Sequence, residues 1–410
     1  MVAFAFPPYN SGSGGLRAYN FYKYLPQYGW RAHVLTVKEN VYDFVDSTFK
    51  LNISDDVTRV FCFDAKRKLS IKGRYPAVLA FPDRYSSWLP SGLIAGMKIV
   101  RKEPILALYS TLQIPTAHLI GLGLKKLTGL PWIAEFRDPW IEDYLPNSSS
   151  FRSRIEGRLE KNIVESADIV LLTTNSLRDY FLRRYKHVDP NRFRVIYNGF
   201  EENYFAHILA EAPSREKEYF NLIHAGAING EFRNPYPVMK ALSELISEEA
   251  IPSKELRLTF IGSGEYTASQ GFLRDVSDLG LEKQINIIDR LPYELCIKWL
   301  QSADILLLLQ YSQEVEMLIP AKTFEYLRIG NPILALADEG ETKQLIESCN
   351  AGWAKNPDDI QGIKNTIYQI YDTYRKGIAW QGPSKEKVTE YSREILTGKL
   401  AAFLEELSMG

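Results

Sequence analysis

The stretch "IPAKTFEYLRIGNPILAL", residues 319–336, combines a helix with the beginning of a buried strand. Pro320 suits an early position of the helix, because a backbone N–H is not needed there. Gly330 and Pro332 break the helix, and the apolar run that follows has the length of a strand buried on both faces. A helix that leads straight into such a strand is typical of parallel sheets covered by helices.

Short apolar runs alternate with segments of helical spacing along the whole chain. The predicted strands are 2–6, 32–37, 105–110, 132–136, 169–174 and 194–199 in the first half, and 220–226, 256–262, 285–289, 305–310 and 332–336 in the second. The predicted fold class is therefore α/β, with two Rossmann-like domains whose parallel sheets face a central cleft.

With 410 residues the chain is too long for one ordinary core. Residues 201–218 are charged and aperiodic, which predicts a linker between an N-terminal domain over 1–200 and a C-terminal domain over 219–383. The last amphipathic stretch, 384–410, could pack on either domain, and a return to the first domain would tie the two together.

Composition excludes several classes of function. The 49 basic and 50 acidic side chains nearly cancel, so we expect no nucleic-acid partner. Cys62, Cys296 and Cys349 lie far apart in or beside apolar runs, as expected for reduced thiols in the cytoplasm. Neither these residues nor the five histidines have the spacing of a metal site, so no metal is expected. No signal peptide or membrane-spanning run is apparent.

Residues 65–102 mix basic side chains with interfacial aromatic residues such as Tyr85 and Trp88. This mixture suits a surface that rests on anionic lipid, so peripheral membrane contact is one interpretation. The other interpretation is a solvated loop that leads into a half-buried helix.

Loops that follow strands hold the candidate site residues, because ligands of parallel sheets bind beyond the carboxyl ends of the strands. After the first strand, Gly14 and Gly15 precede a helix whose free amides could bind a phosphate or a sugar hydroxyl. Such glycines also serve plain packing. At the end of the fourth strand stand Glu135, Arg137 and Asp138, which either cap the sheet or contact a sugar or an acceptor hydroxyl.

The second half repeats this arrangement. Gly226 and Arg233 stand between its first strand and the next helix, and together they form a receptor for pyrophosphate. Arg290 and Leu291 follow its third strand, where main-chain groups could hold the edge of a nucleobase.

The opening stretch completes this set. The amides of Ala321, Lys322 and Thr323 are expected to point out of the helix start toward a diphosphate. Glu325, one turn further on, could accept both hydroxyls of a ribose. Alternatively, Lys322 and Glu325 form an ordinary surface ion pair.

Taken together, these pieces resemble the GT-B glycosyltransferases of the large retaining family 4 over nearly the whole chain. The matching pieces are "FPPYNSGSGGLRAYNFYKYLPQYGWRAHVLTV" (6–37), "WIAEFRDPW" (132–140), "VIYNGF" (195–200), "HAGAINGEFRNP" (224–235) and the stretch at 319–336. The resemblance implies a GT-B fold. It also makes Glu325 the second glutamate of the family's Glu-seven-residues-Glu motif, which holds the donor ribose, and places Ala321 and Lys322 in the diphosphate-binding turn.

Two positions depart from the family pattern. The first glutamate of the motif falls on Met317, while Glu314 and Glu316 stand nearby but out of register. Glu316 and Met317 are the candidates for contact with the transferred sugar. The family usually has an arginine after the first strand of the second domain, but Ile228 and Asn229 occupy that region here. Arg233 is then the remaining cation that could bind a phosphate there.

The reaction implied by the resemblance is transfer of a sugar from a nucleoside-diphosphate sugar to an acceptor hydroxyl, with retention of configuration and without a cofactor. Asp138, Arg233 and Lys322 are the predicted catalytic residues, with Glu135 and Arg137 beside Asp138 on the acceptor side. The acceptor is expected to be lipid-linked or a saccharide, in the synthesis of a cell-surface polysaccharide or glycolipid at the inner face of the membrane. The alternatives are a sugar-nucleotide epimerase with the same scaffold and a non-catalytic nucleotide-sugar-binding protein.

Overall fold

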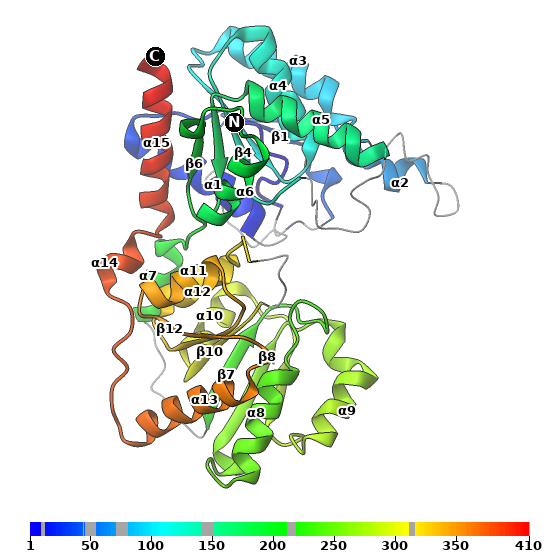
Figure 1. Ribbon diagram of the computed structural model, residues 1–410. Coiled ribbons are helices and arrows are strands. Elements are labelled where there is room, and N and C mark those ends of the chain that lie inside the picture. Colours follow the sequence, from blue (N-terminus) through cyan, green and yellow to red (C-terminus); the bar gives the residue numbers. More distant parts are fainter. Residues whose placement is uncertain are drawn as a thin grey trace. The chain divides into compact units, whose positions relative to one another are not determined.

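The computed structural model describes residues 1–9, 13–43, 45, 55–70, 81–140, 151–210, 219–310 and 316–409. The chain forms two compact units (Figure 1). Unit 1 consists of Met1–Asn198 and Arg393–Gly410, and unit 2 consists of Gly199–Ser392. Each unit is built on parallel strands with helices around them, so the predicted α/β class with two parallel-sheet domains is confirmed.

Unit 1 has a sheet of four parallel strands in the order β3, β4, β5 and β6, and a parallel pair formed by β1 and β2. The bounds are β1 Val34–Val37, β2 Val57–Val60, β3 Leu108–Leu112, β4 Trp132–Phe136, β5 Ile169–Leu172 and β6 Phe193–Val195. Val2 bridges to Leu35 of β1 and to Ser110 of β3, and so joins the two parts. The strand expected at 2–6 is reduced to this one bridged residue, and the residues after it are buried in the core instead.

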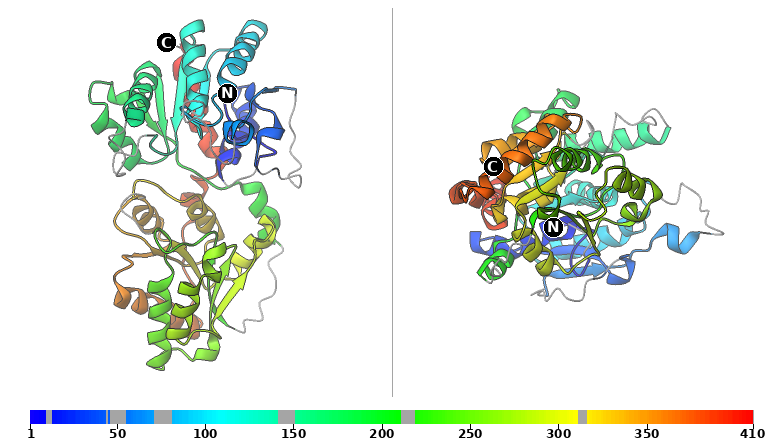
Figure 2. Two further views of the ribbon diagram at one scale, coloured as in Figure 1. Left: turned by 90° about the vertical axis from the view of Figure 1, so that its right-hand side faces the viewer. Right: turned by 90° about the horizontal axis from the view of Figure 1, so that it is seen from below.

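The helices of unit 1 cover this sheet (Figure 2). They are α1 Ser13–Tyr24, α2 Ala65–Leu69, α3 Trp88–Lys102, α4 Pro115–Thr128, α5 Phe151–Ser166, α6 Asn175–Arg184 and α15 Arg393–Met409. The last of these packs on α1, and its Leu396, Leu400 and Leu404 share a buried cluster with Phe21 and Ile133. The C-terminal stretch therefore completes the core of unit 1.

The amphipathic stretch at 384–410 is divided into two helices. Helix α14 (Lys385–Thr389) belongs to unit 2, and α15 begins after Ser392. Ser392 forms a parallel bridge with Phe200, and this pairing requires extended backbone between the two helices. The break thus lies where the chain passes from unit 2 back to unit 1.

Unit 2 has six parallel strands in the order β12, β11, β10, β7, β8 and β9. The bounds are β7 Phe220–Ala225, β8 Leu256–Ile261, β9 Ile285–Ile288, β10 Ile305–Leu309, β11 Ile333–Leu336 and β12 Gly352–Lys355. The other helices are α7 Glu202–Ala210, α8 Tyr236–Ser247, α9 Gln270–Asp278, α10 Tyr293–Gln301, α11 Ala321–Ile329, α12 Glu341–Ser348 and α13 Ile360–Arg375.

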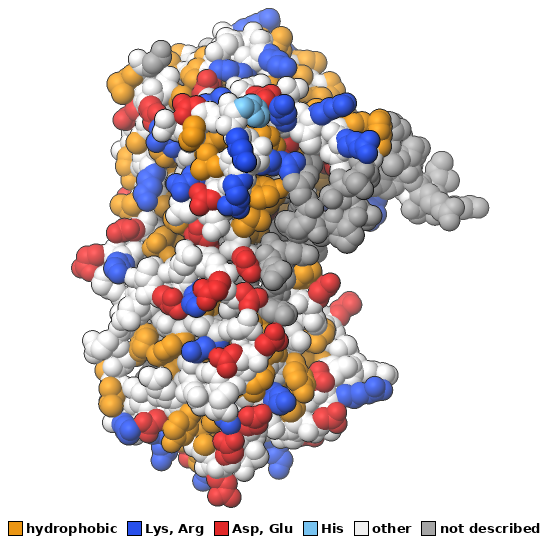
Figure 3. Space-filling view, viewed as in Figure 1, with side chains coloured by type: hydrophobic (Ala, Val, Ile, Leu, Met, Phe, Trp, Pro, Cys, Tyr) orange, Lys and Arg blue, Asp and Glu red, His pale blue; other side chains and the backbone are white. Residues whose placement is uncertain are grey.

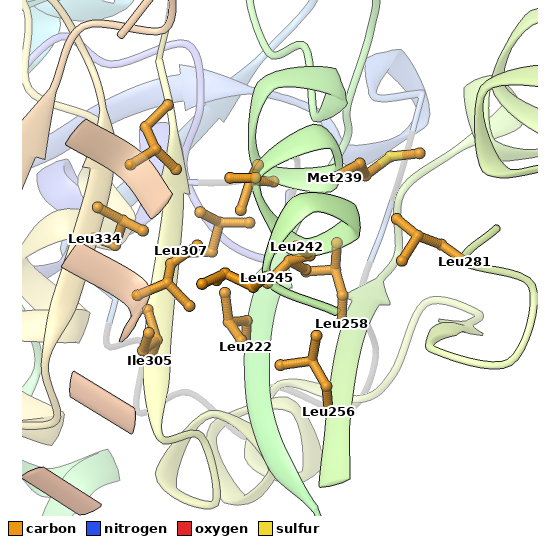
Figure 4. Packing of buried hydrophobic residues seen from close by; sticks show 14 of the residues in the cluster. Leu222, Met239, Leu242, Leu245, Leu256, Leu258, Leu281, Ile305, Leu307 and Leu334 are labelled. Atoms are coloured by element: carbon orange, nitrogen blue, oxygen red, sulfur yellow. The ribbon is translucent and has the colours of Figure 1, made fainter. Parts of the chain in front are cut away.

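The core of unit 2 follows from leucine-rich strands and one amphipathic helix. Leu242 and Leu245 of α8 point toward Leu222, Leu258 and Leu307 on the neighbouring strands (Figure 4). All five are at most 2% exposed. Complete burial of such a side chain contributes about 1.5–3 kcal/mol, so this cluster fixes the strands whose carboxyl ends carry the candidate site.

The linker predicted at 201–218 differs from the structure. Residues 202–210 form α7, which packs against α10 as part of unit 2, and residues 211–218 lie outside the described residues. The prediction failed because the charges of this segment hide apolar residues at helical spacing: Phe205 and Ile208 are buried.

The segment at 65–102 also differs from expectation. Tyr85 is 5% exposed and Trp88 is completely buried, and both rings contact the ring of Phe4. These aromatic residues are core residues of unit 1 and cannot insert into a lipid surface. Residues 71–80 of the segment lie outside the described residues. Within the described part of the chain, no helix has the length and apolar character needed to cross a bilayer.

Candidate functional site

The end of β7 and the start of α11 meet at Gly226. Lys322 donates a hydrogen bond from Nζ to the carbonyl oxygen of Ala225, at 2.5 Å. Gly226 has φ +115°, and a Cβ at this position would lie 2.7 Å from the Lys322 nitrogen. Only glycine combines this backbone conformation with room for the lysine. The structure therefore brings together two residues that the sequence placed in the diphosphate site.

Lys322 is a cation held in a protein environment. Burial and, to a smaller extent, the nearby charge of Arg233 lower its pKa from 10.5 to about 8, while Glu325 acts in the opposite direction. An anionic ligand would stabilise the charged form of this lysine, because the ligand replaces the hydration that the ammonium group has lost. The position suits the phosphates of a nucleotide.

Glu325 lies on the next turn of α11 and accepts a hydrogen bond from the hydroxyl of Tyr293, at 2.9 Å. It is half-buried, which leaves part of the carboxylate open to a ligand. Tyr293 begins α10 and was missed by the sequence analysis, although "RLPYEL" already marked a helix start after the third strand of this domain. Lys322 and Glu325 thus both contact groups of unit 2, the carbonyl oxygen of Ala225 and the hydroxyl of Tyr293.

The prediction for the amide of Thr323, near the start of α11, is wrong, because this amide does not point out of the helix start toward a ligand. The Thr323 amide donates to the carbonyl oxygen of Pro320, at 2.9 Å, and the side chain is completely buried. Pro320 lies directly before the helix rather than inside it. The amides of Ala321 and Lys322 remain as the predicted diphosphate donors, and Thr323 is a packing residue.

Arg233 is exposed in the turn before α8. Asn229 shapes this turn, because its Oδ1 accepts hydrogen bonds from the amides of Phe232 and Arg233, at 2.7 and 2.9 Å. The guanidinium is close enough to Lys322 to lower its pKa. The two cations predicted for the diphosphate therefore lie in the same part of unit 2.

Arg290 and Leu291 follow β9, as predicted. Arg290 is exposed and Leu291 is half-buried. The backbone of Arg290 lies beside Gly262, which follows β8 with φ +63°, and a Cβ there would meet the Arg290 Cα at 3.6 Å. These loops are thus packed side by side at the carboxyl end of the sheet.

Glu316 and Met317 lie before α11, at a different part of the same sheet edge. Glu316 faces the loop after β11: the amide of Glu341 donates to its carbonyl oxygen at 3.2 Å. Burial, together with Asp338 and Glu339, raises the pKa of Glu316. Met317 is half-buried, and Glu314 lies outside the described residues.

In unit 1, the carboxylate of Glu135 is hydrogen-bonded inside the protein and is not placed to contact an acceptor. Its Oε1 accepts from Arg17 Nε at 2.8 Å, and its Oε2 accepts from the hydroxyls of Tyr109 and Thr111, both at 2.6 Å. Burial alone would raise the pKa of this carboxyl, but Arg17 and the two hydroxyls hold it below its usual value. Both carboxylate oxygens are occupied, and the residue is completely buried.

Arg17 extends this network to the end of β6. It donates to the carbonyl oxygens of Tyr197 and Ile196, at 2.7 and 2.8 Å. Arg17 is 4% exposed, so its side chain faces the interior of unit 1 and not solvent. The buried pair ties α1 to the ends of two strands and so serves the structure of unit 1.

The other predicted residues of unit 1 lie nearer its surface. Asp138 is exposed, yet partial desolvation raises its pKa, and the charge of Arg137 opposes that shift. Arg137 is half-buried, and desolvation lowers its pKa. Gly14 and Gly15 lie inside the first turn of α1, not in a loop before it, and belong to a different unit from Lys322.

Comparison with known proteins finds a family profile that matches most of unit 1 and curated relatives that match about half of the chain. Residues 12–199 match the profile of the family described as "Glycosyl transferase 4-like domain". A D-inositol 3-phosphate glycosyltransferase from Corynebacterium glutamicum is 23% identical over 243 residues, which cover 56% of this chain and 57% of that protein. The chain thus spans about half the length of the curated relatives it matches.

Solved structures are similar over almost the whole chain. Sucrose-phosphate synthase from Thermosynechococcus elongatus has a TM-score of 0.64 at 16% identity, and the match covers 99% of this chain and 97% of that one. The Anabaena protein HepE in complex with UDP has a TM-score of 0.65 at 14% identity and covers 97% of each chain. At these identities the likeness shows the fold, which is GT-B.

Replacing Glu135 by Ala is expected to destabilise the protein by about 3–5 kcal/mol, because Arg17 would be left as an unpaired buried charge. Urea unfolding of the purified variant measures this loss. Asp138→Ala is the matched control and should change stability by no more than about 0.5 kcal/mol, since that side chain is exposed. A stable Glu135→Ala protein that had lost activity would instead support the acceptor contact.

Binding of a nucleoside diphosphate is expected to weaken above pH 8, where Lys322 loses its charge, by up to about ten-fold per pH unit. Lys322→Arg should bind with little pH dependence up to pH 10, because arginine stays protonated. Between pH 8 and 10.5 the unfolded chain binds more protons at this residue, so its contribution to stability increases with pH. Weaker nucleotide binding in this pH range would therefore not result from a loss of stability caused by the titration of Lys322. Equal pH dependence of both proteins in calorimetric titrations would contradict the assignment.

Proposed function

Since residues 12–199 match the profile of the glycosyl transferase 4-like domain and the whole chain has the GT-B fold, we propose that it transfers a sugar from a nucleoside-diphosphate sugar to an acceptor hydroxyl. The observation that carries this proposal is the arrangement of Gly226, Lys322 and Glu325 on two adjacent elements of unit 2. A cation and a carboxylate one helical turn apart fit a diphosphate and a ribose.

The proposed chemistry needs positive charge where the leaving diphosphate gains negative charge. Lys322 and Arg233 supply this charge, and the amides of Ala321 and Lys322 at the start of α11 add the positive end of a helix dipole. We propose that these groups act without a resident cofactor or metal ion. Retention of configuration is proposed from the family resemblance, with the departing phosphate oxygen helping to deprotonate the acceptor hydroxyl.

Recognition of the transferred sugar is proposed for Glu316 and Met317. The raised pKa of Glu316 and the acidic side chains beside it make this edge of the sheet a hydrogen-bond acceptor surface suited to sugar hydroxyls. Met317 cannot provide the carboxylate that the family pattern places there. Sugar specificity is therefore expected to differ from that of relatives with the complete motif.

The acceptor site is proposed for unit 1, with Asp138 as its polar contact. Asp138 is exposed at the end of β4, and its raised pKa makes it a better proton acceptor than an ordinary aspartate. Arg137 lies beside it, whereas Glu135 is excluded because both of its oxygens are occupied.

Contact with an anionic membrane surface is proposed for unit 1, which would place the enzyme in the cytoplasm at the inner face of the membrane. Unit 1 carries 30 Lys and Arg against 21 Asp and Glu, whereas unit 2 carries 19 against 29. Basic side chains gather over unit 1 on the face drawn in Figure 3. Phe61 and Ile94, also in unit 1, are about 60% exposed and are proposed as its apolar contacts in place of the buried Tyr85 and Trp88. A lipid-linked or saccharide acceptor of a surface glycan or glycolipid would suit this position.

The proposal is tested by incubating the purified protein with UDP-, GDP-, ADP- and dTDP-sugars, with and without a membrane lipid extract. Release of a nucleoside diphosphate that depends on the extract, with the sugar recovered on a lipid, is the expected result. An isomerised donor without release of nucleotide would favour an epimerase, and a protein that binds none of the donors would contradict the transferase proposal.

Two substitutions are expected to separate donor binding from transfer. Glu325→Ala should weaken binding of the preferred nucleoside diphosphate by at least about 100-fold, because a charge-assisted bidentate contact is lost, while stability changes little. Asp138→Asn should leave that binding unchanged and lower kcat by about 100-fold or more. Calorimetry measures the first effect and steady-state kinetics the second. Unfolding of Glu325→Ala would show instead that Glu325 is structural.

A further inference from the structure

The chain passes between the units at two places, residues 198–199 and 392–393. The segments of unit 2 that adjoin these places, 199–202 and 389–392, are called here the crossing segments. They are joined to each other: the amide of Phe200 donates to the carbonyl oxygen of Tyr391 at 3.2 Å, and Phe200 bridges Ser392. The two crossings therefore form one paired strand connection inside unit 2.

Both crossing segments are attached to α11, the helix that carries Lys322 and Glu325. From the first, Glu202 forms a two-pronged ion pair with Arg328, with distances of 2.6 and 2.7 Å to its guanidinium nitrogens. From the second, the ring of Tyr391 packs on Phe324, with ring centres 5.4 Å apart. Phe324 and Arg328 flank Glu325 in the sequence and lie one turn apart on the helix.

A third connection reaches Glu325 itself. Tyr204, in the first turn of α7, contacts the ring of Tyr293 edge-on, with ring centres 5.8 Å apart. The hydroxyl of Tyr293 donates to Glu325 at 2.9 Å. The carboxylate proposed to bind ribose is thus held by a tyrosine that rests on the helix following the first crossing.

We propose that Glu202, Arg328, Tyr204 and Tyr293 are positioning residues that couple the donor carboxylate to the crossing segments. This inference rests on the proposed function, because it assumes that Glu325 binds the donor. Packed side chains have few alternative arrangements. A nucleotide that restricts the motion of Glu325 therefore also restricts α11, and α11 in turn restricts the two crossing segments that are attached to it. By reciprocity, loosening the crossings weakens donor binding. Glu202 and Tyr204, which the sequence placed in a linker, are therefore part of the donor site's support.

The first test compares binding of UDP, GDP, ADP and dTDP to single and paired variants by calorimetry. Glu202→Ala and Arg328→Ala are each expected to raise the Kd of the preferred nucleotide about five-fold, and the double variant no further, because both remove the same ion pair. Tyr293→Phe should raise Kd by about five- to ten-fold, since Glu325 loses one hydrogen bond. The charge-reversed pair, Glu202→Arg with Arg328→Glu, should recover most of the affinity.

Lys364→Ala is the matched control. Lys364 pairs with Glu244 and Glu248 at 3.3 and 2.8 Å, and joins α13 to α8 in the same unit. This variant should lose a similar amount of thermal stability but bind nucleotide within about two-fold of wild type. Equal weakening in Lys364→Ala and Glu202→Ala would show a general stability effect and overturn the proposal, as would wild-type affinity in Tyr293→Phe and Arg328→Ala.

Hydrogen exchange provides a readout that a merely structural role would not change. Saturating nucleotide should slow hydrogen exchange of the amides of 200–204 and 389–392 in the wild-type protein. In Arg328→Ala at matched occupancy, this slowing should be about three-fold smaller. Unchanged exchange of these segments in the wild-type complex would overturn the coupling. A wild-type protein that binds none of the four nucleotides would refute the proposed function instead, so the two failures are distinguishable.

Discussion

The contact between Lys322 and the carbonyl oxygen of Ala225 is the constraint on which the candidate site depends. It joins the carboxyl end of β7 to the first turn of α11, although 97 residues separate the two partners in the sequence. A parallel sheet makes such contacts natural, because every strand ends at the same edge and every following helix starts there. Gly226 provides space for the Lys322 side chain, and the leucine core of unit 2 fixes the strands. Desolvation disfavours the charge of Lys322, and a bound anion would stabilise it.

Much of this arrangement could be predicted from the sequence. The spacing of apolar residues located most of the described strands, since buried parallel strands read as short continuous runs, but it missed β2 and β12. Motif resemblance located Gly226, Lys322 and Glu325 because their backbone and charge requirements are local. The α/β class followed from the alternation alone.

The remaining features depend on contacts between distant residues. The pairing of Glu135 with Arg17 requires α1 to lie over the end of β4, which no local pattern shows, and so an internal ion pair was taken for an acceptor site. Tyr85 and Trp88 were taken for interfacial residues because composition does not distinguish a buried aromatic ring from an exposed one. Helix α7 was missed because the strongly charged sequence 211–218 follows it directly and obscured its short apolar run.

The return of α15 to unit 1 has a consequence for how the protein is made. Leu396, Leu400 and Leu404 are part of the same buried cluster as Phe21 and Tyr109, so unit 1 has no complete core until these residues have left the ribosome. Unit 2 is continuous in the sequence and finishes emerging earlier. During synthesis, the nucleotide-binding half can therefore fold first, while the N-terminal half waits with an exposed apolar groove and needs either rapid completion or a chaperone.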